Sequence, residues 1–206
     1  MFAQGATQVG RNPSDPKVVS GRLATVEEPA RPASRSAAFE RYSNMAKSVF
    51  YSFHYDHDVH RVQLVRNINA LVGQPVLNAQ AWENVQAGGT NAVVKWIDEQ
   101  MSYKKAVIVL IGKHTVTRPW VKYEIEKAWA DKKPLLGVRI HGLSSLGTVD
   151  AAGGNPFDKV SGVENVPIFD PTVVGWNGIV DSKATYNKLR DNLETWSSKG
   201  VIRSSW

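Results

Sequence analysis

The run AVIVLIG at Ala106–Gly112 constrains the fold of this chain more than any other stretch of the sequence. A strand with one face in water alternates apolar and polar residues, whereas a run that is apolar throughout indicates a strand covered on both faces. A second such run, LLGVRI, follows at 135–140, after a helical pattern over 119–132 that Pro134 ends. Buried strands joined by a helix predict a parallel sheet between layers of helices.

The rest of the chain continues this alternation. β-Branched and aromatic residues predict strands at 47–53 and 166–169 and a weaker one at 76–79. The spacing of apolar residues predicts helices at 59–72, 91–101 and 184–199, and we expect Asp58, Thr90 and Thr117 to cap helices. The last helix is expected to bury a face made of Tyr186, Leu189, Leu193 and Trp196.

These elements predict an α/β fold, a flavodoxin-like three-layer sandwich with a parallel sheet. In such folds ligands bind beyond the carboxyl ends of the strands, which directs attention to the segments after Phe53, Ala79 and Gly112. A Gly-, Ser- and Asp-rich stretch at 142–163 is expected to be a long loop.

Composition divides the chain into two parts. Residues 1–44 contain scattered charges and prolines and have little apolar periodicity, so we expect a flexible N-terminal extension there. The folded domain is expected to span 45–206. The chain has no cysteine, which excludes disulfides, a thiol nucleophile and a cysteine-based metal site. No apolar run is long enough for a transmembrane helix, and we expect a cytoplasmic protein with no membrane partner.

The net charge of +6 and the pI near 9.5 bring nucleic acid into consideration as a partner. However, the basic residues are dispersed, and no nucleic-acid-binding motif is visible. Part of the charge lies in 1–44, where six Lys and Arg against four Asp and Glu leave +2. We therefore do not expect nucleic acid as a partner.

Two segments at the expected ligand edge allow alternative interpretations. The run HYDHDVH at 54–60 could supply metal ligands, but its residues are consecutive rather than converging, and a polar loop that caps a helix explains them as well. The pair Gly88-Gly89 could approach a phosphate or could form a mobile loop, yet it belongs to neither a dinucleotide fingerprint nor a Walker loop.

Trp120 and Glu124 are four residues apart on one face of the expected helix at 119–132. An indole ring can pack on a flat ligand, and a carboxylate can bind a sugar and stabilise positive charge at its anomeric carbon, as glycosidase carboxylates do. The competing interpretation is a surface glutamate that pairs with Lys127.

Together these segments resemble the TIR domain family, in particular the TIR-like proteins of the bacterial Thoeris anti-phage system. VFYSFHYDHD at 49–58 resembles the first TIR strand and its loop, and 81–97 is similar to the mobile BB loop and the helix after it. VLIGKHTVTRPWVKYEIEKA at 109–128 resembles the third strand and the helix with the WxxxE motif, here Trp120 to Glu124. Trp82-Glu83 departs from the usual acidic-hydrophobic run of the BB loop.

The resemblance implies an enzyme that cleaves NAD between nicotinamide and ribose and makes a cyclic ADP-ribose-type signal. NAD would be the substrate, with no other cofactor and no metal. Self-association and a downstream effector that responds to the nucleotide are implied as well, and a non-catalytic TIR scaffold is the alternative. The resemblance makes Glu124 the catalytic residue, and it assigns substrate binding to Tyr51, Ser52, Phe53, His54, Asp56, Trp82, Glu83 and Trp120.

Overall fold

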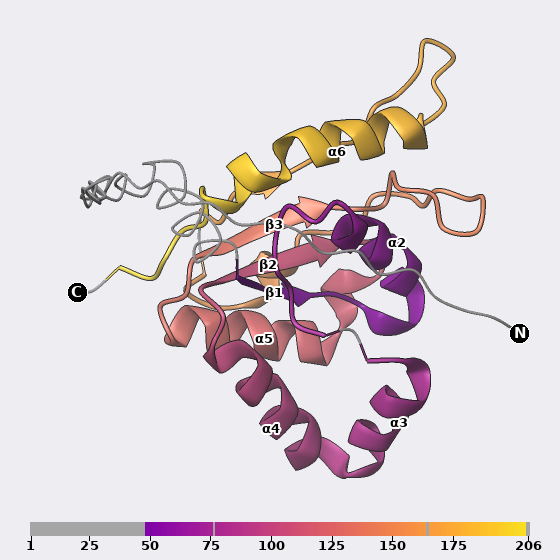
Figure 1. Ribbon diagram of the computed structural model, residues 1–206. Helices are drawn as coiled ribbons and strands as arrows, with labels where there is room; N and C mark the ends of the chain where they lie inside the picture. Colours follow the sequence, from indigo (N-terminus) through magenta and orange to yellow (C-terminus); the bar gives the residue numbers. More distant parts are fainter. Residues whose placement is uncertain (1–47, 76, 164, 205–206) are drawn as a thin grey trace, which may run out of the picture.

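A computed structural model describes residues 48–75, 77–163 and 165–204 (Figure 1). Its centre is a parallel sheet of four strands in the order β1-β2-β3-β4. The strands are β1 (Val49–Ser52), β2 (Ala106–Ile111), β3 (Leu135–Arg139) and β4 (Ile168–Phe169). The parallel sheet is confirmed, and the strand expected at 166–169 is shorter than predicted. The expected flexible extension at 1–44 lies outside the described residues.

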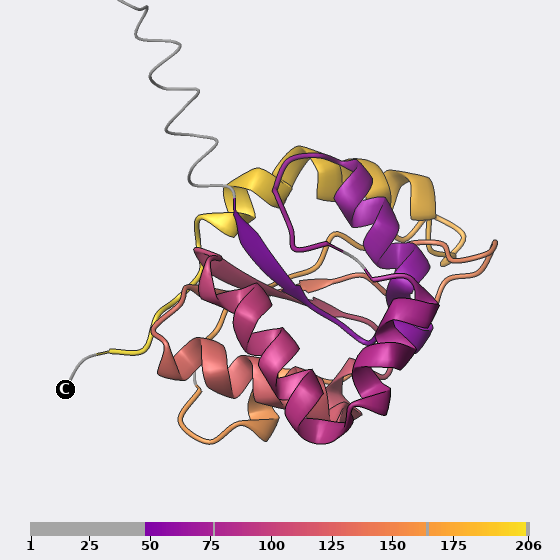
Figure 2. The ribbon, with the colours of Figure 1, turned by 60° about the horizontal axis from the view of Figure 1, so that its bottom comes forward.

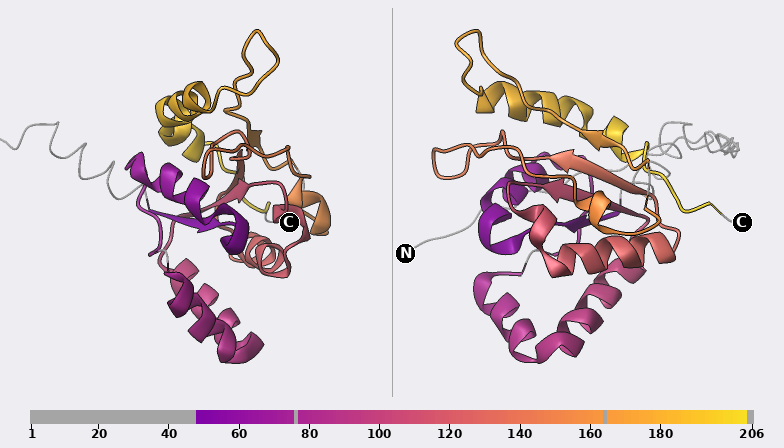
Figure 3. Two further views of the ribbon diagram at one scale, coloured as in Figure 1. Left: turned by 90° about the vertical axis from the view of Figure 1, so that its right-hand side faces the viewer. Right: turned by 180° about the vertical axis from the view of Figure 1, so that it is seen from behind.

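Helices cover both faces of the sheet, which confirms the three-layer α/β sandwich (Figures 1 and 3). Alternate residues of β2 enter opposite cores, with Ile108 and Leu110 on one side and Val107 and Val109 on the other. Every residue of β2 is buried, because both faces pack against helices. The apolar run at Ala106–Gly112 is therefore a strand with two buried faces.

The first face carries α2 (Tyr55–Asn67) and α6 (Ser182–Ser197). The face predicted for the last helix is confirmed, since Leu189 and Leu193 are fully buried and Tyr186 and Trp196 pack beside them. Asp181 caps α6 by accepting a hydrogen bond from the Ala184 N–H at 2.9 Å.

The second face carries α4 (Gly89–Ser102) and α5 (Pro119–Ala130), which lie nearer the viewer than the sheet in Figure 2. A short helix, α3 (Ala79–Ala87), precedes α4 and forms with it a V-shaped pair that projects from the body of the domain (Figure 3). Two 3-10 turns, η1 (Thr115–Thr117) and η2 (Pro156–Lys159), complete the regular elements of the described chain. None of the helices that the structure describes has the length and apolarity to span a membrane.

The three expected helix caps are wrong. Asp58 lies inside α2, which begins at Tyr55 directly after the first strand, and its carboxylate contacts Arg61 instead of a helix end. Thr90 lies inside α4, which begins at Gly89. Thr117 lies in η1, where its hydroxyl donates to the His114 carbonyl at 2.9 Å.

The weak strand expected at 76–79 is not a strand at 77–79, and residue 76 lies outside the described residues. Asn78 accepts a hydrogen bond from the Ala81 N–H at 2.8 Å, so the chain begins α3 at Ala79. The chain pairs with β1 earlier, through a single parallel bridge between Ser48 and Val72.

The side chain of Gln74 continues this edge contact. Its carboxamide accepts from the Tyr51 N–H at 2.8 Å and donates to the Tyr51 carbonyl at 2.7 Å. One side chain thus makes the pair of hydrogen bonds that a neighbouring strand would make with β1.

Candidate functional site

A cleft of about 240 Å³ opens beside the carboxyl end of β1, between the start of α2, the start of α5 and the helices α3 and α4. This is the edge of the sheet at which ligands bind in open α/β folds. The cleft is lined by these residues of the expected set: Tyr51, Phe53, His54, Asp56, Trp82, Trp120 and Glu124.

Glu124 lies at the bottom of this cleft with 8% of its surface exposed. The Ser52 hydroxyl donates a hydrogen bond of 2.5 Å to Glu124 Oε2. Burial raises the pKa of the Glu124 carboxyl to about 8, and the hydrogen bond from Ser52 opposes this rise. The carboxyl is therefore mostly protonated at pH 7 in the free protein.

The pairing of Ser52 with Glu124 follows from the periodicity of their two elements. Ser52 is two residues beyond Phe50 in β1, so both side chains point to the face that α5 covers. Glu124 follows Val121 by three residues and precedes Ile125 on α5, next to its buried stripe. Packing of that stripe on the sheet brings the carboxyl to the end of β1.

The interpretation of Glu124 as a surface partner of Lys127 is wrong. Lys127 Nζ lies 3.1 Å from the Asp131 carboxylate and 3.5 Å from that of Asp98. Glu124 instead turns toward the sheet, where its hydrogen-bond partner is Ser52.

Aromatic side chains form the outer wall of the cleft. The ring of Trp82 lies 5.8 Å from that of Tyr55 and 5.9 Å from that of Trp96, measured between centroids. The Tyr55 hydroxyl donates to the Leu77 carbonyl at 2.8 Å, which fixes the position of its ring. Such a wall can hold a flat aromatic ligand by stacking or edge contacts.

Trp82 and Glu83 lie on a helix, whereas the sequence suggested a mobile loop for this segment. The segment forms α3 because Asn78 caps its first turn. Successive helical residues are rotated by about 100°. Trp82 therefore faces the cleft, while Glu83 is exposed and lies outside the lining.

Ten residues of the lining lie outside the set predicted from the sequence, and among them are Gln74, Trp96 and Arg118. Gln74 carries no signal in the sequence, because its place depends on hydrogen bonds to β1. Arg118 could have been found, because it directly precedes the expected helix at the ligand edge. Its Nε is buried and has no hydrogen-bond partner within the described part of the chain.

The histidines of the 54–60 segment do not converge on one point. The rings of His54 and His57 lie 4.9 Å apart, and that of His57 lies 4.9 Å from the ring of His114, again between centroids. Within the described ranges no group of three His, Asp or Glu residues could hold a metal ion. His54 is 4% exposed, and burial is the largest of the causes that lower its pKa to about 4.

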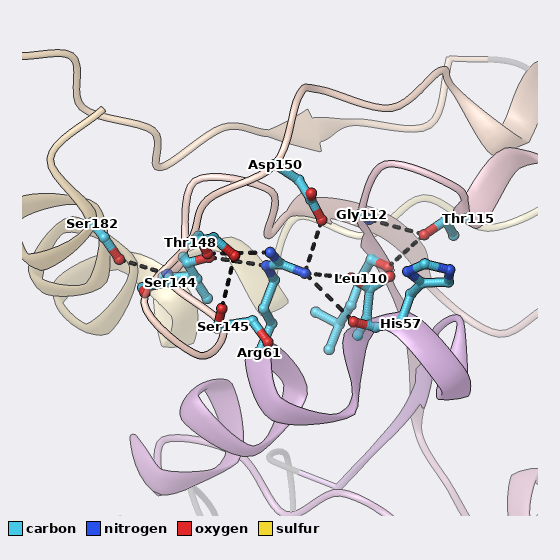
Figure 4. A network of polar contacts seen from close by, with 12 residues as sticks. His57, Arg61, Leu110, Gly112, Thr115, Ser144, Ser145, Thr148, Asp150 and Ser182 are labelled. Carbon is cyan, nitrogen blue, oxygen red and sulfur yellow. Dashed lines mark hydrogen bonds and ion pairs between the residues drawn. The ribbon is translucent and has the colours of Figure 1, made fainter. Parts of the chain in front are cut away.

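Arg61 contacts the Asp58 carboxylate one turn earlier on α2, and Figure 4 shows the network of polar contacts around Arg61. Arg61 Nε donates to the Leu143 carbonyl at 2.9 Å, and Arg61 Nη1 lies 3.0 Å from the Asp150 carboxylate. Arg61 thereby fastens the 143–150 loop to α2. A side chain at Gly112 would collide with the Asp58 carboxylate, which explains the glycine that ends the AVIVLIG run.

The sequence of the chain is similar to that of Thoeris proteins of the ThsB type. Residues 50–145 match the family model described as the TIR-like domain of the Thoeris protein ThsB. The chain is also 34% identical over 121 residues to ThsB1 of Bacillus cereus (strain MSX-D12), a protein provisionally named a cyclic ADP-D-ribose synthase. That alignment covers 55% of this chain and 62% of the relative, so the chain spans less than two thirds of the relative's length.

Proposed function

Since residues 50–145 match the TIR-like domain of the Thoeris protein ThsB, we propose that this chain cleaves NAD and closes the ADP-ribose part into a cyclic nucleotide signal. The observation that carries the proposal is a buried Glu124, hydrogen-bonded to Ser52, in a cleft walled by aromatic rings. The name of the relative from Bacillus cereus supports the same activity.

Glu124 acts on the ribose of the bound dinucleotide in this proposal. In the free protein its raised pKa keeps the carboxyl mostly protonated at neutral pH. The nicotinamide ring of NAD is a cation, and a cation close to a carboxyl group favours the charged carboxylate. Substrate binding thus creates the carboxylate that stabilises the oxocarbenium-like transition state, where positive charge develops on the ribose.

The bond between C1′ of the ribose and the nicotinamide nitrogen breaks, and its electron pair stays with nicotinamide. Nicotinamide leaves as a neutral molecule, so its departure needs no proton from the protein. A nucleophilic group of the same ADP-ribose molecule then attacks C1′ and releases a proton, so NAD⁺ yields nicotinamide, a cyclic ADP-ribose and H⁺. Attack by water would give linear ADP-ribose, and aromatic walls that exclude water favour the cyclic product.

NAD serves as the substrate in this scheme, and the proposal includes no further cofactor. We place the reaction in the cytoplasm of a bacterial cell under phage attack, where the cyclic product activates a separate effector. Self-association of the TIR-like domain is the remaining part of the proposal.

The direct test is release of nicotinamide from NAD by the purified full chain, with a crowding agent present to promote assembly. Wild-type protein is expected to release nicotinamide and to give a cyclic product on chromatography. Glu124→Gln is expected to lose at least about 100-fold in rate, the range of a removed charge-stabilising group. Glu126→Gln is the matched control, because Glu126 lies on the same helix, pairs with Lys122 and is half exposed.

Two outcomes would contradict the proposal. Equal rates for wild type and Glu124→Gln would remove Glu124 from the reaction. A folded protein that assembles but releases no nicotinamide would instead indicate the non-catalytic scaffold.

A further inference from the structure

Arg118 lines the cleft but takes no part in the reaction steps above. It directly precedes α5 as the N-cap residue, and its carbonyl accepts the Lys122 N–H at 3.1 Å. Its guanidinium group carries a permanent charge. The buried Nε has no acceptor among the described residues, and a buried donor without an acceptor is costly. An acceptor supplied by a ligand would remove this cost.

His54 gives a second, independent indication of a ligand at the same place. It lines the same cleft and is 4% exposed, yet neither ring nitrogen has a hydrogen-bond partner in the described chain. The Asp56 carboxylate lies 3.5 Å from Nε2, beyond an ordinary hydrogen bond. The charge of Arg118 contributes to the lowered pKa of His54, so the two side chains are in electrostatic contact. A neutral imidazole offers one N–H donor to a ligand.

The first turn of α5 adds a third source of positive potential. No side chain caps this helix, and its first residues, from Pro119 to Val121, line the cleft. The free N–H groups of a helix start carry the positive end of the helix dipole and bind anions. The carboxylate of Asp56, whose side chain is 71% exposed, lies at the edge of this region, 3.5 Å from His54 Nε2.

We propose that Arg118, together with the His54 N–H and the first turn of α5, binds the diphosphate of NAD and thereby selects dinucleotides over phosphate-free nucleosides. This inference rests on the proposed function. A guanidinium group can donate two parallel hydrogen bonds to phosphate oxygens, which a lysine cannot. Arg118 and Glu124 are six residues apart, or about 9 Å along the helix axis. The ribose that joins the diphosphate to nicotinamide can bridge that separation.

The test begins with binding of ADP-ribose to the full chain, measured by titration calorimetry. Arg118→Gln is expected to raise the Kd for ADP-ribose about 10- to 100-fold, the range of one lost hydrogen bond to a charged group. Arg118→Lys should recover part of the affinity, since it restores the charge but not the fork. Lys122→Gln is the matched control, because Lys122 is exposed one turn further along α5, and it should bind as wild type does.

A second measurement separates recognition of the diphosphate from a general structural effect. Nicotinamide release from NAD and from nicotinamide riboside is compared for wild type and Arg118→Gln. Arg118→Gln should lose kcat/KM for NAD, mainly through KM, and keep its kcat/KM for the riboside. An equal loss for both substrates, or a Kd for ADP-ribose equal to that of wild type, would overturn the inference. If wild type cleaves neither substrate, the proposed function fails, and the ADP-ribose titration alone decides the role of Arg118.

Discussion

Replacing Glu124 with glutamine should stabilise the folded protein at neutral pH while it removes the proposed activity. Glu124 is buried, and its pKa rises from 4.5 to about 8 on folding. A carboxyl whose pKa is raised by folding stabilises the fold most at a pH below the pKa that it has in the unfolded chain. This contribution is lost as the pH rises toward the pKa that the carboxyl has in the folded protein. Glutamine has nearly the same shape as glutamate and does not titrate. The stability of the variant should therefore lack this dependence on pH.

The expected size follows from the shift. Between pH 4.5 and 8 the unfolded carboxyl is ionised and the folded one is protonated, so wild type loses about 1.4 kcal/mol of unfolding free energy for each pH unit. By pH 7 the loss attributable to Glu124 is about 3 kcal/mol, and it levels off near 5 kcal/mol above pH 8. At each pH the unfolding free energy of Glu124→Gln should exceed that of wild type by these amounts. The excess is reduced by about 1 kcal/mol, because an amide N–H group of the glutamine is left without an acceptor.

Urea unfolding of both proteins at half-unit steps from pH 5 to pH 9 measures the difference directly. The difference in unfolding free energy between variant and wild type should grow across pH 5 to 8 and then become constant. Parallel curves over that range would refute the reasoning, because they would mean that Glu124 has an ordinary pKa in the folded protein. Glu126→Gln should follow wild type at every pH, since its carboxylate is half exposed.

Three further changes test other parts of the structure. Ser52→Ala removes the hydrogen bond that lowers the pKa of Glu124. In a pH–rate profile, the pH at which kcat/KM for NAD reaches half of its alkaline plateau should therefore move upward from about 8. Arg61→Met leaves the buried Asp58 carboxyl without its cation, and urea unfolding should reveal a loss of about 3 kcal/mol, whereas a loss below about 1 kcal/mol would contradict the network. Leu193→Ala empties a fully buried position of α6 and should cost about 2 to 5 kcal/mol by the same measurement, and a change within about 0.5 kcal/mol would mean that α6 is not packed on the sheet.

The sequence predicted those elements whose pattern is set by burial. The apolar run at Ala106–Gly112 and the stripe of α6 each reflect contact with a core, so periodicity alone identifies them. Periodicity failed for α3, where the pair Gly88-Gly89 suggested a loop. In the structure these glycines form only the junction between α3 and α4, and the positive φ of Gly89, 77°, permits the turn.

The parts of the candidate site that lie within a single helix or strand could be predicted from the sequence. Trp120 and Glu124 share one helix, so their spacing in the sequence is enough to identify them as a pair. The bond between Ser52 and Glu124 joins residues that are 72 positions apart, and only the packing of α5 on the sheet brings them together. Gln74 enters the cleft for the same reason, because its position depends on hydrogen bonds to β1.

The two hydrogen bonds between Gln74 and Tyr51 also have a consequence for solubility. β1 is an outermost strand of the described sheet, and beyond the bridge at Val72 the Gln74 carboxamide pairs with the N–H and carbonyl of Tyr51 in this strand. An uncovered strand edge is a template for pairing with another molecule. Gln74 therefore protects this strand edge from pairing with another molecule. Because Gln74 also lines the cleft, replacing it with a smaller residue to widen the pocket would expose the strand edge as well.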